Sequence, residues 1–126
     1  GTDVTIVSFG KIIKEAYKAA DELEKEGISC EIIDLRTVRP LDKEAILKSV
    51  KKTNRLVILE EAWPFGNVST EITYIIQSEA FDYLDAPIIK INTADTPAPY
   101  SPVLLAEWLP NASDVVKAVK EVMYVK

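Results

Sequence analysis

Short apolar runs alternate along this chain with longer amphipathic segments, and this alternation constrains the fold more than any other feature. The predicted strands are residues 4–9, 29–35, 55–60 and 87–91. The predicted helices are residues 11–26, 43–53 and 68–81, and a last helix capped by Asn111 or Ser113. The strands lack polar alternation, which is typical of strands covered on both faces. The sequence therefore predicts a three-layer α/β/α fold with a mostly parallel sheet, in one domain of residues 1–126.

Local signals support the ends and the buried faces of these helices. Gly27 is the stop signal of the first helix, and Asp42 is the N-cap of the second. The predicted inward face of the first helix consists of Ile12, Ile13, Ala16, Tyr17, Ala20 and Leu23. We therefore expect helices that each bury one face against the sheet.

The composition narrows the classes of partner. The chain has 15 basic and 20 acidic side chains and a net charge of −5, which disfavours nucleic acid and anionic membranes as partners. No apolar run reaches the roughly 20 residues that span a bilayer. Cys30 is the single cysteine, so a disulfide within the chain is excluded. The chain has no histidine, which excludes most of the usual acid–base and metal chemistry. We expect a reducing, cytoplasmic setting. Because the sequence starts at Gly1 without Met, we also expect that a tag was removed or that the chain is a piece of a longer protein.

Two short segments resemble enzymatic sites, each with a simpler alternative. Residues 8–11 join a strand to a helix, where some folds bind phosphate, but a structural turn is favoured because the glycine spacing of nucleotide sites is missing. Glu60 and Glu61 form an acidic pair at a strand end. They resemble an acidic catalytic pair, and the simpler alternative is a solvated strand end or pairing with Arg36 or Arg39. A hydrolase triad is impossible without histidine.

Proline-rich loops and charges near chain turns indicate a partner surface. Trp63, Phe65 and Tyr100 lie in such loops. These aromatic side chains could form a surface that binds a partner, or they could cover the hydrophobic core. Asp82 and Asp85 are predicted to end the third helix, where negative charge is unfavourable to the helix dipole. Binding of a basic partner would explain them, although Asp85 could simply start the turn before Pro87.

Five motifs, taken in order, resemble the transketolase C-terminal domain family, and within it the beta subunits of pyruvate dehydrogenase decarboxylating components. They are DLRTVRPLD at 34–42, EEAWPFG at 60–66, DAP at 85–87, ADTPAPY at 94–100 and WLP at 108–110. The resemblance covers essentially the whole chain. It implies a mixed sheet whose first, antiparallel strand would precede Gly1. It also implies that thiamine diphosphate and magnesium lie between the alpha subunit and another domain of the beta subunit, so that this chain holds no catalytic, cofactor-binding or metal-binding residue and is inert alone.

The same resemblance implies two roles for this chain in an intact enzyme that decarboxylates pyruvate and transfers the acetyl group to lipoyl. The first is association with the alpha subunit and a second beta subunit. The residues assigned to this subunit interface are Trp63, Phe65, Tyr100, Arg36 and Arg39. The second is docking to the peripheral subunit-binding domain of the acetyltransferase core, through Asp82, Asp85 and Tyr124. The competing hypothesis is an independent α/β module that binds a nucleotide or another small molecule at residues 8–11.

Overall fold

The computed structural model describes residues 1–35, 42–60, 68–92 and 110–125. The strands are β1 (Val4–Ser8), β2 (Cys30–Asp34), β3 (Leu56–Leu59) and β4 (Ile89–Ile91). The helices are α1 (Ile13–Lys25), α2 (Lys43–Thr53), α3 (Val68–Glu79) and α5 (Ala112–Val122), with the 3-10 turns η1 (Gly10–Ile12) and η2 (Phe81–Tyr83). Each predicted strand and helix is confirmed, with ends that differ from the prediction by at most two residues.

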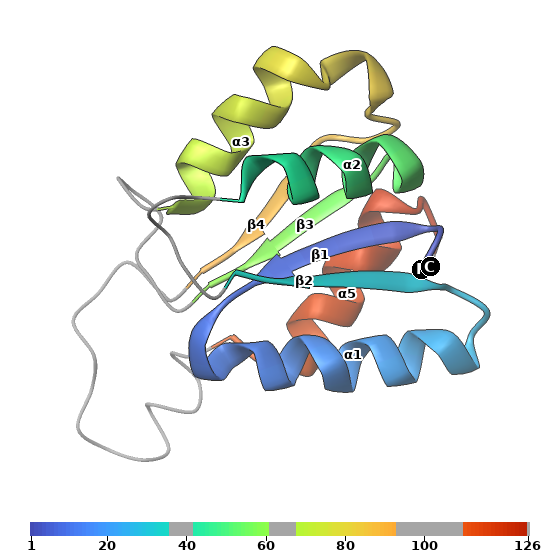
Figure 1. Ribbon diagram of the computed structural model, residues 1–126. Coiled ribbons are helices and arrows are strands. Elements are labelled where there is room, and N and C mark those ends of the chain that lie inside the picture. The colour runs from blue at the N-terminus through green and yellow to red at the C-terminus, as the bar shows by residue number, and fades with distance from the viewer. Residues whose placement is uncertain (36–41, 61–67, 93–109, 126) are drawn as a thin grey trace.

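The four strands form one sheet in the order β2-β1-β3-β4, and all three pairings are parallel. The amino ends of the strands therefore share one edge of the sheet, which we call the amino edge, and their carboxyl ends share the carboxyl edge. Helices α2 and α3 cover one face, and α1 and α5 cover the other (Figure 1). The predicted α/β/α layering is confirmed, whereas the antiparallel strand before Gly1 stays a prediction.

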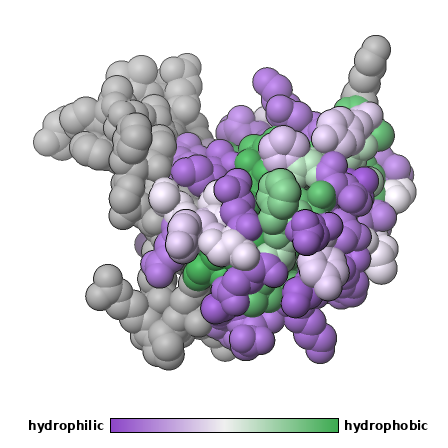
Figure 2. All heavy atoms as spheres, turned by 90° about the horizontal axis from the view of Figure 1, so that it is seen from above, coloured by the Kyte–Doolittle hydropathy of each residue, from purple (hydrophilic) through white to green (hydrophobic). Residues whose placement is uncertain are grey.

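Strand residues alternate between two separate hydrophobic cores. Ile6 and Leu59 pack with the inner faces of α1 and α5, whereas Val7 and Ile58 pack with α2 and α3. Each fully buried aliphatic side chain contributes about 1.5–3 kcal/mol of transfer free energy. Seen from the side of α2 and α3, hydrophilic side chains surround a smaller hydrophobic area (Figure 2). Burial on both faces of β1 and β3 explains why these two central strands lack polar alternation in the sequence.

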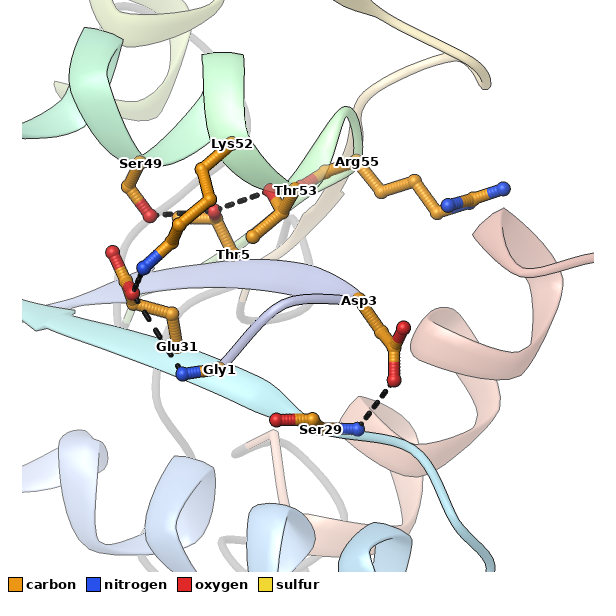
Figure 3. Close-up of polar contacts among 9 residues, drawn as sticks. All are labelled: Gly1, Asp3, Thr5, Ser29, Glu31, Ser49, Lys52, Thr53 and Arg55. Carbon is orange, nitrogen blue, oxygen red and sulfur yellow. Dashed lines mark hydrogen bonds and ion pairs between the residues drawn. The ribbon is translucent and has the colours of Figure 1, made fainter.

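Buried hydroxyl groups join α2 to the central strand. Thr5 Oγ1 lies 2.7 Å from both Ser49 Oγ and Thr53 Oγ1, and all three residues are buried (Figure 3). Thr53 Oγ1 also donates to the carbonyl of Arg55 at 3.1 Å. Because these hydroxyls satisfy one another, α2 packs on β1 without unpaired polar groups at that contact.

Three details of the helices differ from the prediction. Tyr17 is 51% exposed, and Ala19, which lies three positions after Ala16, is buried in its place. The third helix ends at Glu79, so Asp82 lies in η2 and Asp85 in the bend before Pro87. The expectation that these two acidic residues end the helix is therefore wrong, and the alternative of a turn before Pro87 is confirmed for Asp85. Within the described ranges, no helix is both long and apolar enough to cross a membrane.

Candidate functional site

The predicted docking residues lie at the amino edge of the sheet. Asp82 and Asp85 are exposed on the segment between α3 and β4, and Tyr124 follows the C-terminal end of α5. Tyr124 Oη donates a long hydrogen bond, 3.4 Å, to the backbone carbonyl of Asp85. The structure therefore brings together two chain segments that are about 40 residues apart in sequence. We call Asp82, Asp85 and Tyr124 the docking surface.

The end of α5 presents Tyr124 in an unusual backbone conformation. Tyr124 has φ 57, in the left-handed region that favours glycine. Its N–H donates to the carbonyl of Glu121 at 3.1 Å, and the N–H of Val125 donates to the carbonyl of Lys120 at 3.0 Å. These two bonds form a Schellman motif, which usually has glycine in the place of Tyr124. The tyrosine ring is 70% exposed, so the core gains little from it.

A small groove adjoins the docking surface. Its volume is about 230 Å³, and it lies between the start of β4 and the end of α5. The lining residues are Ala86, Pro87, Ile89, Glu121, Val122 and Tyr124. Apolar walls together with the carboxylate of Glu121 suit a side chain that joins an aliphatic stem to a positive charge.

Asn54 and Arg55 support the docking surface, and the sequence interpretation missed both. Arg55 Nη2 lies 3.9 Å from Asp85 Oδ2, and Arg55 Nε donates to the carbonyl of Val122 at 3.1 Å. The backbone carbonyl of Asn54 accepts a 2.8 Å hydrogen bond from the N–H of Asp85. An Asn directly after a helical segment is a signal for a left-handed helix end, and Asn54 has φ 66. Its contacts with residues about 30 positions away have no such local signal.

A cation–π contact lies next to the segment that carries Asp82 and Asp85. The ammonium of Lys51 lies 5.3 Å from the centre of the Tyr83 ring, a cation–π contact. Tyr83 is an exposed aromatic residue, and it separates Asp82 from Leu84 on the segment before β4. This contact joins the segment that carries the acidic residues to a basic residue of α2.

At the carboxyl edge, the environment of Glu60 differs from one that the sequence suggested. The alternative of a solvated strand end is wrong for this residue, because Glu60 is fully buried. Its Oε1 accepts a 2.7 Å hydrogen bond from Asn92 Nδ2, and within the described part of the chain its Oε2 has no hydrogen-bond partner. Asn92 immediately follows β4, so this bond joins the carboxyl ends of two neighbouring strands.

The turn at residues 8–11 has the geometry of a structural turn. Gly10 has φ 73, and a Cβ there would meet nothing within 4 Å, so the backbone angle alone explains the glycine. The hydroxyl of Ser8 is buried and has no hydrogen-bond partner among the residues that the structure describes. A phosphate in solvent could not reach it, and this geometry does not favour a nucleotide site.

The residues predicted for the subunit interface cannot be placed. Arg36, Arg39, Trp63, Phe65 and Tyr100 all lie outside the described residues. The sheet positions that precede them are described: Leu35, Glu60 and Asn92 each lie directly after a strand, at the carboxyl edge. The docking surface and the three strand ends Leu35, Glu60 and Asn92 thus lie at opposite edges of one sheet.

A model of the transketolase C-terminal domain matches residues 1–115. The chain belongs to this family. A solved structure of a split-gene transketolase, described as an inactive beta4 tetramer, matches with a TM-score of 0.87 and 31% identity, over 100% of this chain and 41% of that one. A 2-oxoglutarate:ferredoxin oxidoreductase from Magnetococcus marinus matches at a TM-score of 0.65 and 15% identity, over 97% of this chain and 18% of that one, and so shares the fold alone.

Curated relatives of this transketolase C-terminal domain are named as pyruvate dehydrogenase E1 component subunits beta. The Rickettsia conorii protein is 52% identical over 98% of this chain, and the Rhizobium meliloti protein is 53% identical over 98%. The mitochondrial Saccharomyces cerevisiae protein is 46% identical over 100% of the chain. The chain spans 38%, 27% and 35% of the length of these three relatives. Because one of the three is mitochondrial, a cytoplasmic location stays a prediction.

Proposed function

We propose that this chain is the subunit-association and core-docking domain of the beta subunit of a thiamine-diphosphate-dependent pyruvate dehydrogenase. The observation that carries this proposal is the sequence identity with proteins named as pyruvate dehydrogenase beta subunits, which is 52% and 53% over 98% of the chain. The intact enzyme would decarboxylate pyruvate oxidatively and transfer the acetyl group to lipoyl. By itself the domain would be inactive.

The docking role is supported by the charge and shape of the amino edge. Asp82 and Asp85 are exposed and acidic, and the groove that Tyr124 lines has mainly apolar walls. Such a surface complements a partner that carries basic side chains with aliphatic stems. We assign this partner to the peripheral subunit-binding domain of the acetyltransferase core. Tyr124 would contribute an exposed aromatic ring to the contact.

The association role is assigned to the opposite edge of the sheet. Trp63, Phe65, Tyr100, Arg36 and Arg39 would contact the alpha subunit or a second beta subunit there. Large aromatic side chains and arginine are enriched at protein interfaces, which supports this choice of residues. The related split-gene transketolase is described as a beta4 tetramer, which supports self-association of chains of this type.

The cofactor would bind outside this chain. Among the described residues, no three His, Cys, Asp or Glu side chains gather where they could hold a metal ion. The described residues therefore offer no cluster of three such ligands for a metal ion, and we assign thiamine diphosphate and its magnesium to the remainder of the intact enzyme.

The test uses the full beta subunit produced together with its alpha partner. Light scattering should give the mass of an alpha2-beta2 tetramer, and the tetramer should decarboxylate pyruvate only when thiamine diphosphate and magnesium are present. Trp63→Ala with Tyr100→Ala should lower the mass. Tyr17→Ala, which removes an exposed ring on α1, is the matched control and should leave the mass unchanged. A tetramer that persists in the double variant would refute the assignment of the interface, and absence of the activity would refute the proposed enzyme.

A further inference from the structure

Two neighbouring residues of one turn, Asn54 and Arg55, contact both chain segments of the docking surface. The carbonyl of Asn54 accepts the N–H of Asp85 at 2.8 Å, and Asn54 Nδ2 donates to the carbonyl of Tyr83 at 2.7 Å. These bonds hold the backbone on both sides of Leu84. Asn54 thereby fixes the course of the segment that carries the acidic residues.

Arg55 reaches the second segment as well as the first. Its side chain extends toward α5 in Figure 3, and its Nε donates to the carbonyl of Val122, the last residue of that helix. The same guanidinium has Nη2 3.9 Å from Asp85 Oδ2. The base of the side chain is held by the backbone, because the carbonyl of Arg55 accepts the N–H of Thr5 at 2.9 Å. One planar group therefore spans the acidic side chain and the helix end that precedes Tyr124.

Arg55 leaves Asp85 available to a partner. The side chain of Asp85 is 57% exposed and that of Arg55 is 24% exposed, and 3.9 Å is at the outer limit of an ion pair. One N–H of the guanidinium is already used by Val122. A cation that approaches from solvent can therefore bind the carboxylate while Arg55 stays in place.

We propose that Arg55 is a positioning residue for the docking surface, which fixes Asp85 relative to Tyr124 so that one basic partner domain meets both at once. This inference rests on the docking role proposed above and adds a residue to it. A surface that is ordered before binding loses less conformational freedom on association, and such an advantage is expected mainly in the dissociation rate.

The experiment uses the full beta subunit assembled with its alpha partner and immobilised for surface plasmon resonance, with the peripheral subunit-binding domain in solution. Arg55→Lys keeps the positive charge but loses the planar fork that contacts two groups. We expect dissociation to become roughly threefold to tenfold faster, with an unchanged association rate and salt dependence. Arg55→Met should dissociate faster as well, and should associate faster because it removes a positive charge beside Asp85.

Two controls separate positioning from charge and from stability. Lys43→Met removes a cation from the far end of α2, where it pairs with Glu79 at 2.6 Å, and should bind as the parent does. Ser49→Ala weakens the buried hydroxyl contact with Thr5, away from the docking surface, and should lower stability without changing dissociation. Equal acceleration in Ser49→Ala would overturn the positioning role.

Asp85→Asn distinguishes the docking role of the surface from the positioning role of Arg55. If this variant binds as tightly as the parent, the docking role itself is wrong and the inference on Arg55 is overturned with it. If Asp85→Asn weakens binding but Arg55→Lys dissociates at the parental rate, the docking role stands and only the positioning role is overturned. Faster dissociation in both variants, with effects that are less than additive when combined, is the expected result.

Discussion

Helices α1 and α5 end in the same hydrogen-bond pattern but with different residues. After α1, the N–H of Gly27 donates to the carbonyl of Glu24 at 3.0 Å and the N–H of Ile28 to that of Leu23 at 2.9 Å. After α5, Tyr124 and Val125 donate in the same way, at 3.1 Å and 3.0 Å. The left-handed residue is glycine in the first case and tyrosine in the second.

The two helix ends differ in how much apolar surface they bury, so one contributes to the hydrophobic core and the other to the docking surface. Ile28 is buried against Leu23, so the first motif closes the core. Val125 is 47% exposed and Tyr124 is 70% exposed, so the second motif buries little. A left-handed non-glycine residue costs about 1 kcal/mol, and residues in such conformations are often found at functional sites. The end of α5 is thus consistent with selection for binding.

The largest effect should come from one of the two apolar residues that end these motifs, Ile28. Ile28→Ala should lower the free energy of unfolding by about 2–4 kcal/mol, because it leaves a cavity beside Leu23. Val125→Ala should lower it by less than about 0.5 kcal/mol, because Val125 is half exposed. Urea denaturation of both variants measures the comparison. Equal losses would mean that the two ends contribute alike to the core.

The glycine itself should matter less than the residue after it. Gly27→Ala should cost about 1 kcal/mol, from the positive φ of 84 alone. No steric cost is added, because a Cβ at this position meets nothing within 4 Å. The midpoint of urea denaturation, compared with that of an exposed helix variant such as Lys14→Ala, checks this value. A loss above about 3 kcal/mol would show that more than the backbone angle is involved.

The matching change at the other end should have the opposite sign. Tyr124→Gly should raise the free energy of unfolding by up to about 1 kcal/mol, because glycine relieves the left-handed strain. Binding of the peripheral subunit-binding domain should weaken in the same variant, because the exposed ring is lost. Denaturation and calorimetric titration measure the two effects separately. A variant that loses stability and keeps its affinity would contradict the interpretation of this end.

The smallest expected effect is a pH dependence at the strand that follows α1. Desolvation of the half-buried thiol, and then the charge of Asp3, raise the pKa of Cys30 to about 11, from 9.0 for a free thiol. Because the folded state favours the neutral thiol, its contribution to stability is complete below pH 9 and is lost as the pH rises toward 11. The parent should therefore lose more stability than Cys30→Ala between pH 8.5 and about 10.5, and the difference should stay small because the half-buried thiol is partly screened by solvent. Parallel slopes for the two proteins would contradict this.

Periodicity predicted the fold because each strand and helix of this chain agrees with its local pattern. Short, mainly apolar runs predicted the four strands, and Gly27, Asp42 and Asn111 marked helix ends that the structure confirms. Tyr17 was assigned to the wrong face because it lies next to Ala16, at the margin of the apolar stripe. Local pattern decides which elements form, and packing decides their margins.

The site was less predictable because it depends on contacts between distant residues. Asp82, Asp85 and Tyr124 could be named from charge and resemblance, and the structure brings Asp85 and Tyr124 into contact. The contribution of Asn54 and Arg55 needed the sheet order, which places the start of β3 beside the start of β4. The burial of Glu60 had no signal either, because its partner Asn92 lies 32 positions away.

The most direct test of the docking role is the affinity of the assembled enzyme for the peripheral subunit-binding domain, measured for the parent and for Asp85→Asn over a range of salt concentrations. The docking role predicts that the parent binds less tightly as salt increases. It also predicts that Asp85→Asn binds about tenfold or more weakly, with a flatter dependence on salt. An Asp85→Asn variant whose affinity and salt dependence match those of the parent would contradict the account.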